Sequence, residues 1–300
     1  MRLNRGFPEI IVCTLSWGTI GVLVRNVEAS SPVITFFRLS FGVIVVLAWL
    51  AVLGRLRSLR PGPRRGLLGA SGLVLACHWA LQFEAFKRLE VAAAILIVFL
   101  GPVLMAALAP IVLRERLRAV SIGALVLAFG GIALITGPQV GEIDPAGVAA
   151  AVGSAVLFAA LVLMGKLLTV HYEPPVIVAW QLGLASVVIS PALIGTSAAA
   201  IGRDLPELAL LGAVLTGALG IVFFHAVRAL QAQQISVLFY LEPASAVVYA
   251  WWALSERPSA ATLLGGALIV VAGLAIIRAD RPVMAPAGLP DAVVGMGDER

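Results

Sequence analysis

The sequence predicts an all-α integral membrane protein with ten transmembrane helices, and three observations support this. Apolar runs of about twenty residues recur along the chain, each long enough to cross roughly 30 Å of hydrocarbon. The 300 residues are 61% hydrophobic and only 12% charged, whereas soluble domains carry about a quarter charged residues. Because lipid offers backbone amides no hydrogen-bond partner, runs of this length must be helices rather than the short alternating strands of a barrel.

Charges, prolines and glycines mark the ends of each apolar run. The first five expected spans are 9–26, 33–53, 66–86, 91–113 and 119–137. The second five are 145–168, 174–194, 206–229, 234–254 and 259–278. The amino end resembles a signal peptide, but no convincing cleavage site follows and the run is long enough to span, so we expect it to remain as the first helix.

The basic residues orient these helices, because cytoplasmic loops carry an excess of Lys and Arg. With the amino terminus inside, 15 of the 21 Lys and Arg residues lie on the cytoplasmic side and five lie on the other. Both termini are therefore expected in the cytoplasm of a cell whose inner (plasma) membrane holds the protein. Residues 279–300 have no periodic apolar face and are expected to form a disordered cytoplasmic tail. Since the basic residues lie between spans, they indicate topology rather than nucleic-acid binding.

The second half of the chain repeats the first at an offset of 141 to 143 residues. The pairs that align include Trp17 with Phe158, Arg38 with Gln181, Phe99 with Tyr240, Pro102 with Pro243, and Gly131 with Gly273. Residues 1–137 then form a first five-helix repeat and residues 138–278 a second. Because five is odd, the second repeat enters the membrane from the opposite side and is inverted. Inverted repeats around a midplane site are a recurrent transporter design, although a duplication can also simply build a larger bundle.

The stretch YLEPASAVVYAWWALSERPSAATLLGGALIVVAG, with Trp17-Gly18, Pro32, Arg38 and Gly101-Pro102, resembles the EamA-type ten-helix branch of the drug/metabolite transporter superfamily. The resemblance covers nearly the whole chain before the tail. It implies export of metabolites, amino acids or toxic compounds, or uptake of quaternary amines, through a cavity at the repeat interface. Where the family often has a tyrosine in the eighth helix, this chain has Phe224 and His225, so the resemblance implies no particular substrate.

Polar side chains within the spans are the default site candidates, because each costs a few kcal/mol unless it faces a partner or a wet cavity. Arg38 either reaches the head groups or provides a counter-charge for a substrate carboxylate or an acidic side chain. Gln181 is its counterpart in the other repeat. His78, with Gln82 one turn further on, and His225 are either hydrogen-bonded core residues or proton acceptors and ligands.

Glu242 directly precedes Pro243, where a missing backbone donor can break the helix and expose polar groups to a cavity. At helical spacing Ser245 and Tyr249 share its face. The alternative is that Glu242 simply reaches interfacial water. The aromatic residues Trp17, Phe158, Trp180 and Tyr240 are packing residues individually, but together they would form a cavity wall for an aromatic ring or an ammonium group.

These features predict a secondary active transporter that moves a small polar metabolite outward by alternating access, without cofactor, metal or catalytic residues. We expect His78, His225 or Glu242 to carry a coupling proton, if transport is proton-driven. The other expected partners are membrane lipids and a second copy of the chain in a homodimer. An importer of a quaternary amine such as choline is the first alternative. A membrane-embedded lipid-modifying enzyme is the alternative from another class, disfavoured because no HExxH, paired Asp or GxSxG motif occurs.

Overall fold

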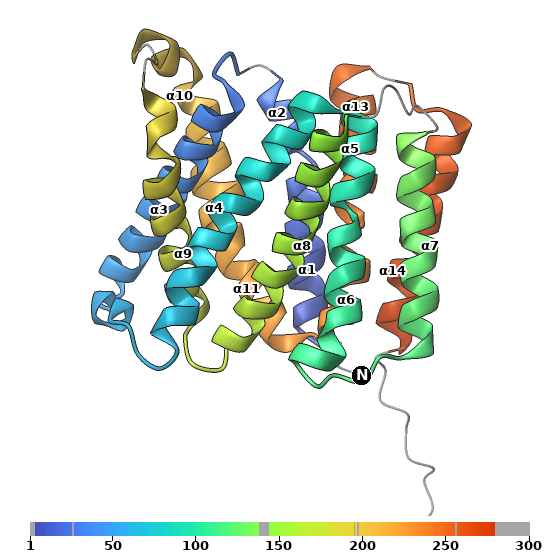
Figure 1. Ribbon diagram of the computed structural model, residues 1–300, viewed down its shortest axis with the longest axis horizontal. Coiled ribbons are helices and arrows are strands. Elements are labelled where there is room, and N and C mark those ends of the chain that lie inside the picture. Colours follow the sequence, from blue (N-terminus) through green and yellow to red (C-terminus); the bar gives the residue numbers. More distant parts are fainter. Residues whose placement is uncertain are drawn as a thin grey trace, which may run out of the picture.

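The computed structural model describes residues 4–25, 27–137, 144–194, 196, 198–255 and 257–279, and the predicted tail lies outside this part apart from Ala279. Regular structure in the described residues is helical throughout (Figure 1). The first half contains α1 (Gly6–Trp17), α2 (Ile20–Val24), α3 (Ser31–Val52), α4 (Arg65–Arg88), α5 (Val91–Val98), α6 (Leu100–Val112) and α7 (Ala119–Thr136). The second contains α8 (Pro145–Leu168), α9 (Pro174–Ile189), α10 (Ala198–Gly212), α11 (Leu219–Ala229), α12 (Ala232–Phe239), α13 (Leu241–Leu254) and α14 (Ala260–Ala279).

Ten helical segments in the described residues are long and apolar enough to cross a membrane, which confirms the predicted class and number. Most ends agree within three residues, but the eighth span begins at Ile201 rather than 206. The charges of Arg203 and Asp204 end the apolar run there, while the helix continues because Asp204 is buried and its carboxylate accepts a hydrogen bond from the Ala29 amide at 2.9 Å.

In the described residues, three of the ten spans contain a break of one or two non-helical residues. The first is broken between α1 and α2, at Gly18 and Thr19. The fourth is broken at Phe99 and the ninth at Tyr240. Pro102 and Pro243 follow the last two breaks by three residues, and each lacks the amide that would bond to the carbonyl four residues earlier. The sequence predicted the break before Pro243, and the structure has the matching break in the first half.

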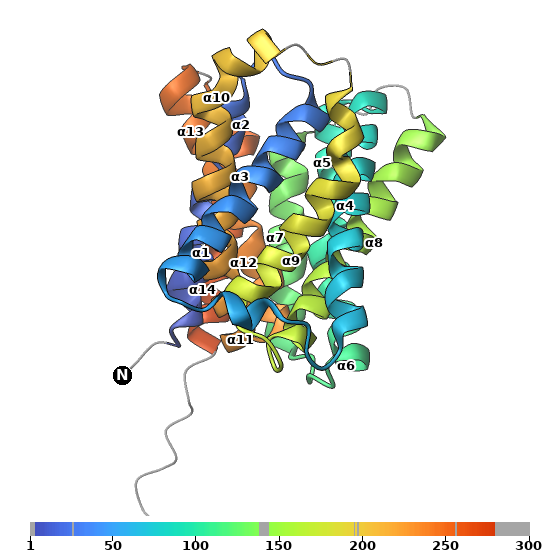
Figure 2. The same ribbon diagram turned by 90° about the vertical axis from the view of Figure 1, so that its left-hand side faces the viewer.

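The helices of the two halves pack in reciprocal pairs. α1 packs on α11 and α4 on α8, while α7 packs on α14. α3 lies against α9 (Figure 2). Figure 1 shows α1 and α8 running in opposite directions, and it places the start of α1 and the end of α14 at one face of the bundle. We call this the terminal face; α3 begins and α4 ends at the opposite face.

The α7–α14 contact depends on two glycines. A Cβ built on Gly131 or on Gly265 would meet the carbonyl oxygen of the other glycine, so the two backbones touch. Small residues permit such close approach of membrane helices, where packing rather than the hydrophobic effect holds helices together.

We therefore expect Gly265→Val to destabilise the protein by about 1–3 kcal/mol, the range for overpacking a tight contact. Gly266→Val is the matched control, because nothing lies within 4 Å of a Cβ at Gly266. The midpoint of thermal unfolding in detergent should fall for the first variant and stay near wild type for the second. Equal effects of the two variants would contradict a tight α7–α14 contact.

Candidate functional site

Arg38 lies two turns into α3, about 10 Å from its start by helix rise. Its Nε donates a hydrogen bond to Thr216 Oγ1 at 3.3 Å, and its guanidinium carbon is 4.8 Å from the centre of the Trp79 ring. Thr216 belongs to a π-helical turn, η3 (Ala213–Ala218), and donates its own hydroxyl to the Leu211 carbonyl. The π turn thus places a hydroxyl where the buried guanidinium needs one, consistent with the frequent occurrence of such turns at functional sites.

The outer nitrogens of Arg38 remain available. Within the described part of the chain, neither they nor the carboxylate oxygens of Glu242 have a hydrogen-bond or ion-pair partner. Protein surrounds both side chains, yet both keep some accessible surface. Each is also in the electrostatic field of the other. The interior therefore presents one positive and one negative group, without a direct bond between them.

Glu242 is held by the contact between α13 and α1. Ser245 Oγ donates to the Glu242 carbonyl at 2.8 Å and is close to the Thr14 and Leu15 carbonyls of α1. A Cβ on Gly18 would collide with this hydroxyl, so the glycine at the α1 break allows α13 to approach. The same break ends α1 at Trp17.

An aromatic cluster lies beside these groups. Trp17 donates its indole N–H to the Leu215 carbonyl in η3 at 2.7 Å, and its ring centre is 5.5 Å from Phe223 and 5.7 Å from Phe239. Phe239 also meets Phe158, with the ring centres 4.9 Å apart in an edge-to-face arrangement. Residues from α1, α8, α11 and α12 therefore form one wall. Phe223 and Phe239 were not predicted from the sequence, although each is adjacent to a candidate position, Phe224 and Tyr240 respectively.

Tyr240 connects the two broken spans. Its hydroxyl donates to the Phe99 carbonyl at 2.6 Å, and the two rings are 5.8 Å apart. The Tyr240 side chain is wholly buried, so it is held by protein and is not free to contact a substrate. Because Phe99 is the counterpart of Tyr240 in the first half, this bond joins the two helix breaks directly.

His78 is buried, with Nδ1 at 2.9 Å from both the carbonyl and the hydroxyl of Ser154, and its ring is 5.7 Å from Phe158. Gln82 lies one turn further along α4 and is half-buried. Gln181 is also buried, and its Nε2 is the one buried side-chain nitrogen or oxygen without a partner in the described residues. A buried, unpaired amide has a free-energy cost, so Gln181 is the place where a water or ligand acceptor would be stabilising.

The remaining candidates are placed elsewhere. Trp180 donates its indole N–H to the Leu59 carbonyl in the loop at the terminal face, at 3.0 Å. His225 is on the exposed side of α11, next to exposed Arg228 one turn on. Tyr249 lines a groove of about 280 Å³ on the side of the bundle, together with Thr19 and Trp252. No contact between any of these three residues and Arg38 is found in the described part of the chain: His225 is exposed, Tyr249 lines a groove on the side of the bundle, and Trp180 is partly buried in α9 with its indole directed to Leu59.

The fold, the interrupted spans and the charged interior define a multi-pass membrane protein of the transporter class. The sequence profile of the EamA-like transporter family matches residues 5–137 and 145–278. The chain belongs to this family, within the drug/metabolite transporter superfamily, and is a membrane transporter.

Several relatives span nearly the same length. An uncharacterized transporter, YxxF of Bacillus subtilis, is 27% identical over 276 residues, covering 89% of this chain and 88% of the relative. The pseudopaline exporter CntI of Pseudomonas aeruginosa strain UCBPP-PA14 is 28% identical over 286 residues, covering 92% and 97%. A solved crystal structure superposes with a TM-score of 0.83 over 95% of this chain and 100% of its own, at 20% identity, which supports the fold.

The Tyr240 bond yields a direct prediction. Tyr240→Phe keeps the ring but removes the donor to the Phe99 carbonyl, so it should destabilise the protein by about 1–2 kcal/mol. Tyr249→Phe is the matched control, because the Tyr249 hydroxyl has no hydrogen bond within the described residues. Thermal unfolding of both variants in detergent measures the difference. If the unfolding midpoint of Tyr240→Phe is no lower than that of the control, the hydrogen bond between Tyr240 and Phe99 does not stabilise the two helix breaks.

Proposed function

We propose that this transporter exports a small molecule that carries both a carboxylate and an ammonium group, by alternating access between two inverted five-helix repeats, residues 1–137 and 138–278. The observation that supports this most strongly is the Arg38 guanidinium, whose outer nitrogens are unbonded and face an interior that also contains Glu242. The substrate's carboxylate binds Arg38, and its ammonium group lies toward Glu242.

Geometry favours a carboxylate at Arg38. The guanidinium is a planar fork that binds a carboxylate through two parallel hydrogen bonds, which a lysine cannot do. Thr216 occupies only Nε, and Trp79 covers only one face of the plane, so the outer edge remains open. A charge at this depth is costly without a counter-charge, and the substrate supplies one.

The other end of the substrate meets Glu242 and the aromatic wall. An ammonium group is attracted both to a carboxylate and to the faces of aromatic rings such as Trp17. A quaternary amine without a carboxylate, such as choline, would leave Arg38 without its partner, so the importer alternative has less support. Membership in a transporter family likewise supports transport over the lipid-modifying enzyme.

Alternating access requires a closure that opens, and we assign this closure to a network at the terminal face. Lys166 Nζ is 3.4 Å from Glu115 Oε1 and donates to the Val227 and Leu230 carbonyls, and Glu115 Oε2 accepts from the Ala232 amide at 2.8 Å. This partly buried network joins the loop after α6 to α8 and to the start of α12. With the terminal face in the cytoplasm, as the basic residues predict, the network closes the cytoplasmic side.

The proposal also covers the direction of transport and its coupling to protons. Outward transport has the support of a relative that is named an exporter. Of the three proton-coupling candidates, Glu242 faces the interior and His78 is hydrogen-bonded beside the aromatic wall, whereas His225 is exposed away from both. We therefore assign proton coupling, where it occurs, to Glu242, with His78 as the second candidate.

The test is counterflow in proteoliposomes with L-phenylalanine and with phenethylamine, which differ by the carboxylate alone, and with choline. We expect Arg38→Gln to reduce phenylalanine counterflow by at least about tenfold, as for a charge-assisted contact of 1.4 kcal/mol or more. Arg38→Lys should recover only part of it. Arg228→Gln removes an exposed charge from α11 and is the control.

Three outcomes separate the alternatives. Phenylalanine flux that depends on Arg38 supports the proposal, and flux that Arg38→Gln leaves unchanged refutes it. Choline flux without phenylalanine flux would support the amine importer instead. A pH gradient that drives phenylalanine flux in wild type but not in Glu242→Gln would support proton coupling at Glu242.

A further inference from the structure

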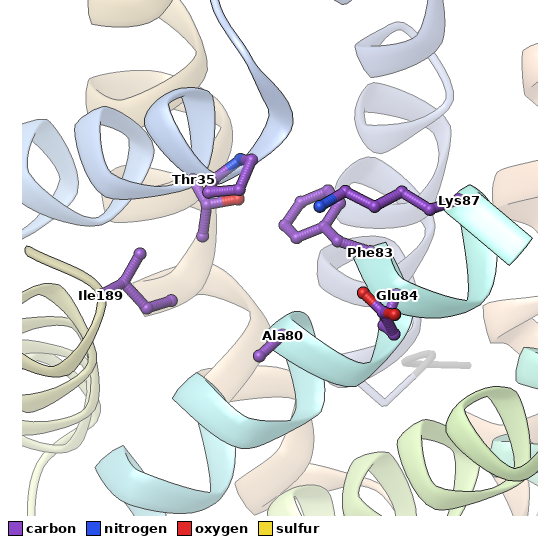
Figure 3. A pocket seen from close by; sticks show the side chains of 7 residues that line it. Thr35, Ala80, Phe83, Glu84, Lys87 and Ile189 are labelled. Carbon is purple, nitrogen blue, oxygen red and sulfur yellow. The ribbon is translucent and has the colours of Figure 1, made fainter. Parts of the chain in front are cut away.

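A separate small pocket opens at the opposite face, between the start of α3 and the end of α4 (Figure 3). Its volume is about 140 Å³. The residues that line it are Pro32, Thr35, Ala80, Phe83, Glu84, Lys87 and Ile189. None of them belongs to the central site, and no sequence pattern predicted a pocket here.

The pocket lies one helical turn outward from Arg38 along the same two helices. Thr35 precedes Arg38 by three residues on α3, and Phe83 follows Trp79 by four on α4, so each pair shares a helix face. Arg38 and Trp79 are themselves in contact. The pocket therefore lies directly outward of the Arg38–Trp79 contact, between the same two helices.

The lining of the pocket contains one acidic and one basic side chain, Glu84 and Lys87. Glu84 is already engaged, because its Oε1 is 2.5 Å from Arg88 Nε, and Arg88 also pairs with Asp144 at 3.2 Å. The Lys87 ammonium has no hydrogen bond or ion pair in the described part of the chain. Figure 3 shows the Lys87 side chain extending over Phe83 toward Thr35, across the pocket. Its charge is thus available to an anionic group.

We infer that this pocket is an outer subsite that binds the substrate's carboxylate after it leaves Arg38. Its volume is well below the roughly 300–1,000 Å³ of sites that enclose a whole ligand, so it accommodates one end group. Arg38 on the inner side and Lys87 on the outer side of the same helix pair place two cations in succession toward the opposite face, where a carboxylate released by one can bind the other. This inference rests on the proposed function, because it uses the same carboxylate.

The kinetic test uses substrate added from the opposite face of oriented proteoliposomes. Lys87→Ala should raise the KM for L-phenylalanine by roughly fivefold, the effect of one partly exposed charge contact, with a smaller effect at high salt. Its KM for phenethylamine should not change, and Lys87→Arg should restore the wild-type value. Arg203→Ala, which removes an exposed cation paired with Glu28 at the same face, is the control.

A chemical readout tests the subsite without transport. In a Cys77→Ser background, Ala80→Cys places a thiol in the pocket, and we expect an anionic methanethiosulfonate to react several-fold faster than a cationic one. Lys87→Ala should remove this preference, and L-phenylalanine should slow the reaction. If the preference holds while transport fails to depend on Arg38, the proposed function is wrong and the pocket is merely anion-attracting.

Other results would overturn the subsite. Equal reaction rates of the two reagents, or a KM unaffected by Lys87→Ala while Arg38→Gln abolishes flux, would show that Lys87 binds no carboxylate. Labelling that is blocked in phosphatidylglycerol liposomes but not in phosphatidylcholine liposomes would show that a lipid phosphate occupies the pocket instead.

Discussion

The structure depends above all on the cost of an arginine placed two turns inside a membrane helix. An ionised group at that depth persists only with partners that replace water. The protein supplies three: a hydroxyl from a π-helical turn, the face of Trp79, and the field of Glu242. None of them saturates the guanidinium. We propose that this unfilled hydrogen-bonding capacity of Arg38 binds the charged group of the substrate.

The two halves of the chain are connected near this site by a hydrogen bond between their helix breaks. Pro102 and Pro243 interrupt equivalent spans, and the Tyr240 hydroxyl bonds to the carbonyl at the other break. Tight glycine contacts hold α7 against α14, and both helices pack on α12, which ends at the second break. The bundle therefore combines a close-packed pair of helices with a polar, interrupted centre.

Much of the fold follows from one-dimensional features of the sequence. The length and apolarity of the runs located the ten spans, because a backbone in lipid must be helical to satisfy its hydrogen bonds. Pro243 indicated a helix break, because proline lacks the backbone donor. The site was less predictable. Polar residues are rare within the spans and are therefore easy to select as candidates, but the sequence does not show which way their side chains point. Arg38, His78 and Glu242 face the interior, whereas His225 faces outward and Trp180 bonds to a loop. Phe223, Phe239 and the π turn depend on contacts between distant helices, and no local pattern marks them.

The most direct test of the central claim is an experimental structure with L-phenylalanine bound. We predict both carboxylate oxygens within hydrogen-bonding distance of the outer nitrogens of Arg38, with the ring against Trp17, Phe158 and Phe239. Arg38 bonded directly to Glu242, with the ligand bound elsewhere, would contradict this account.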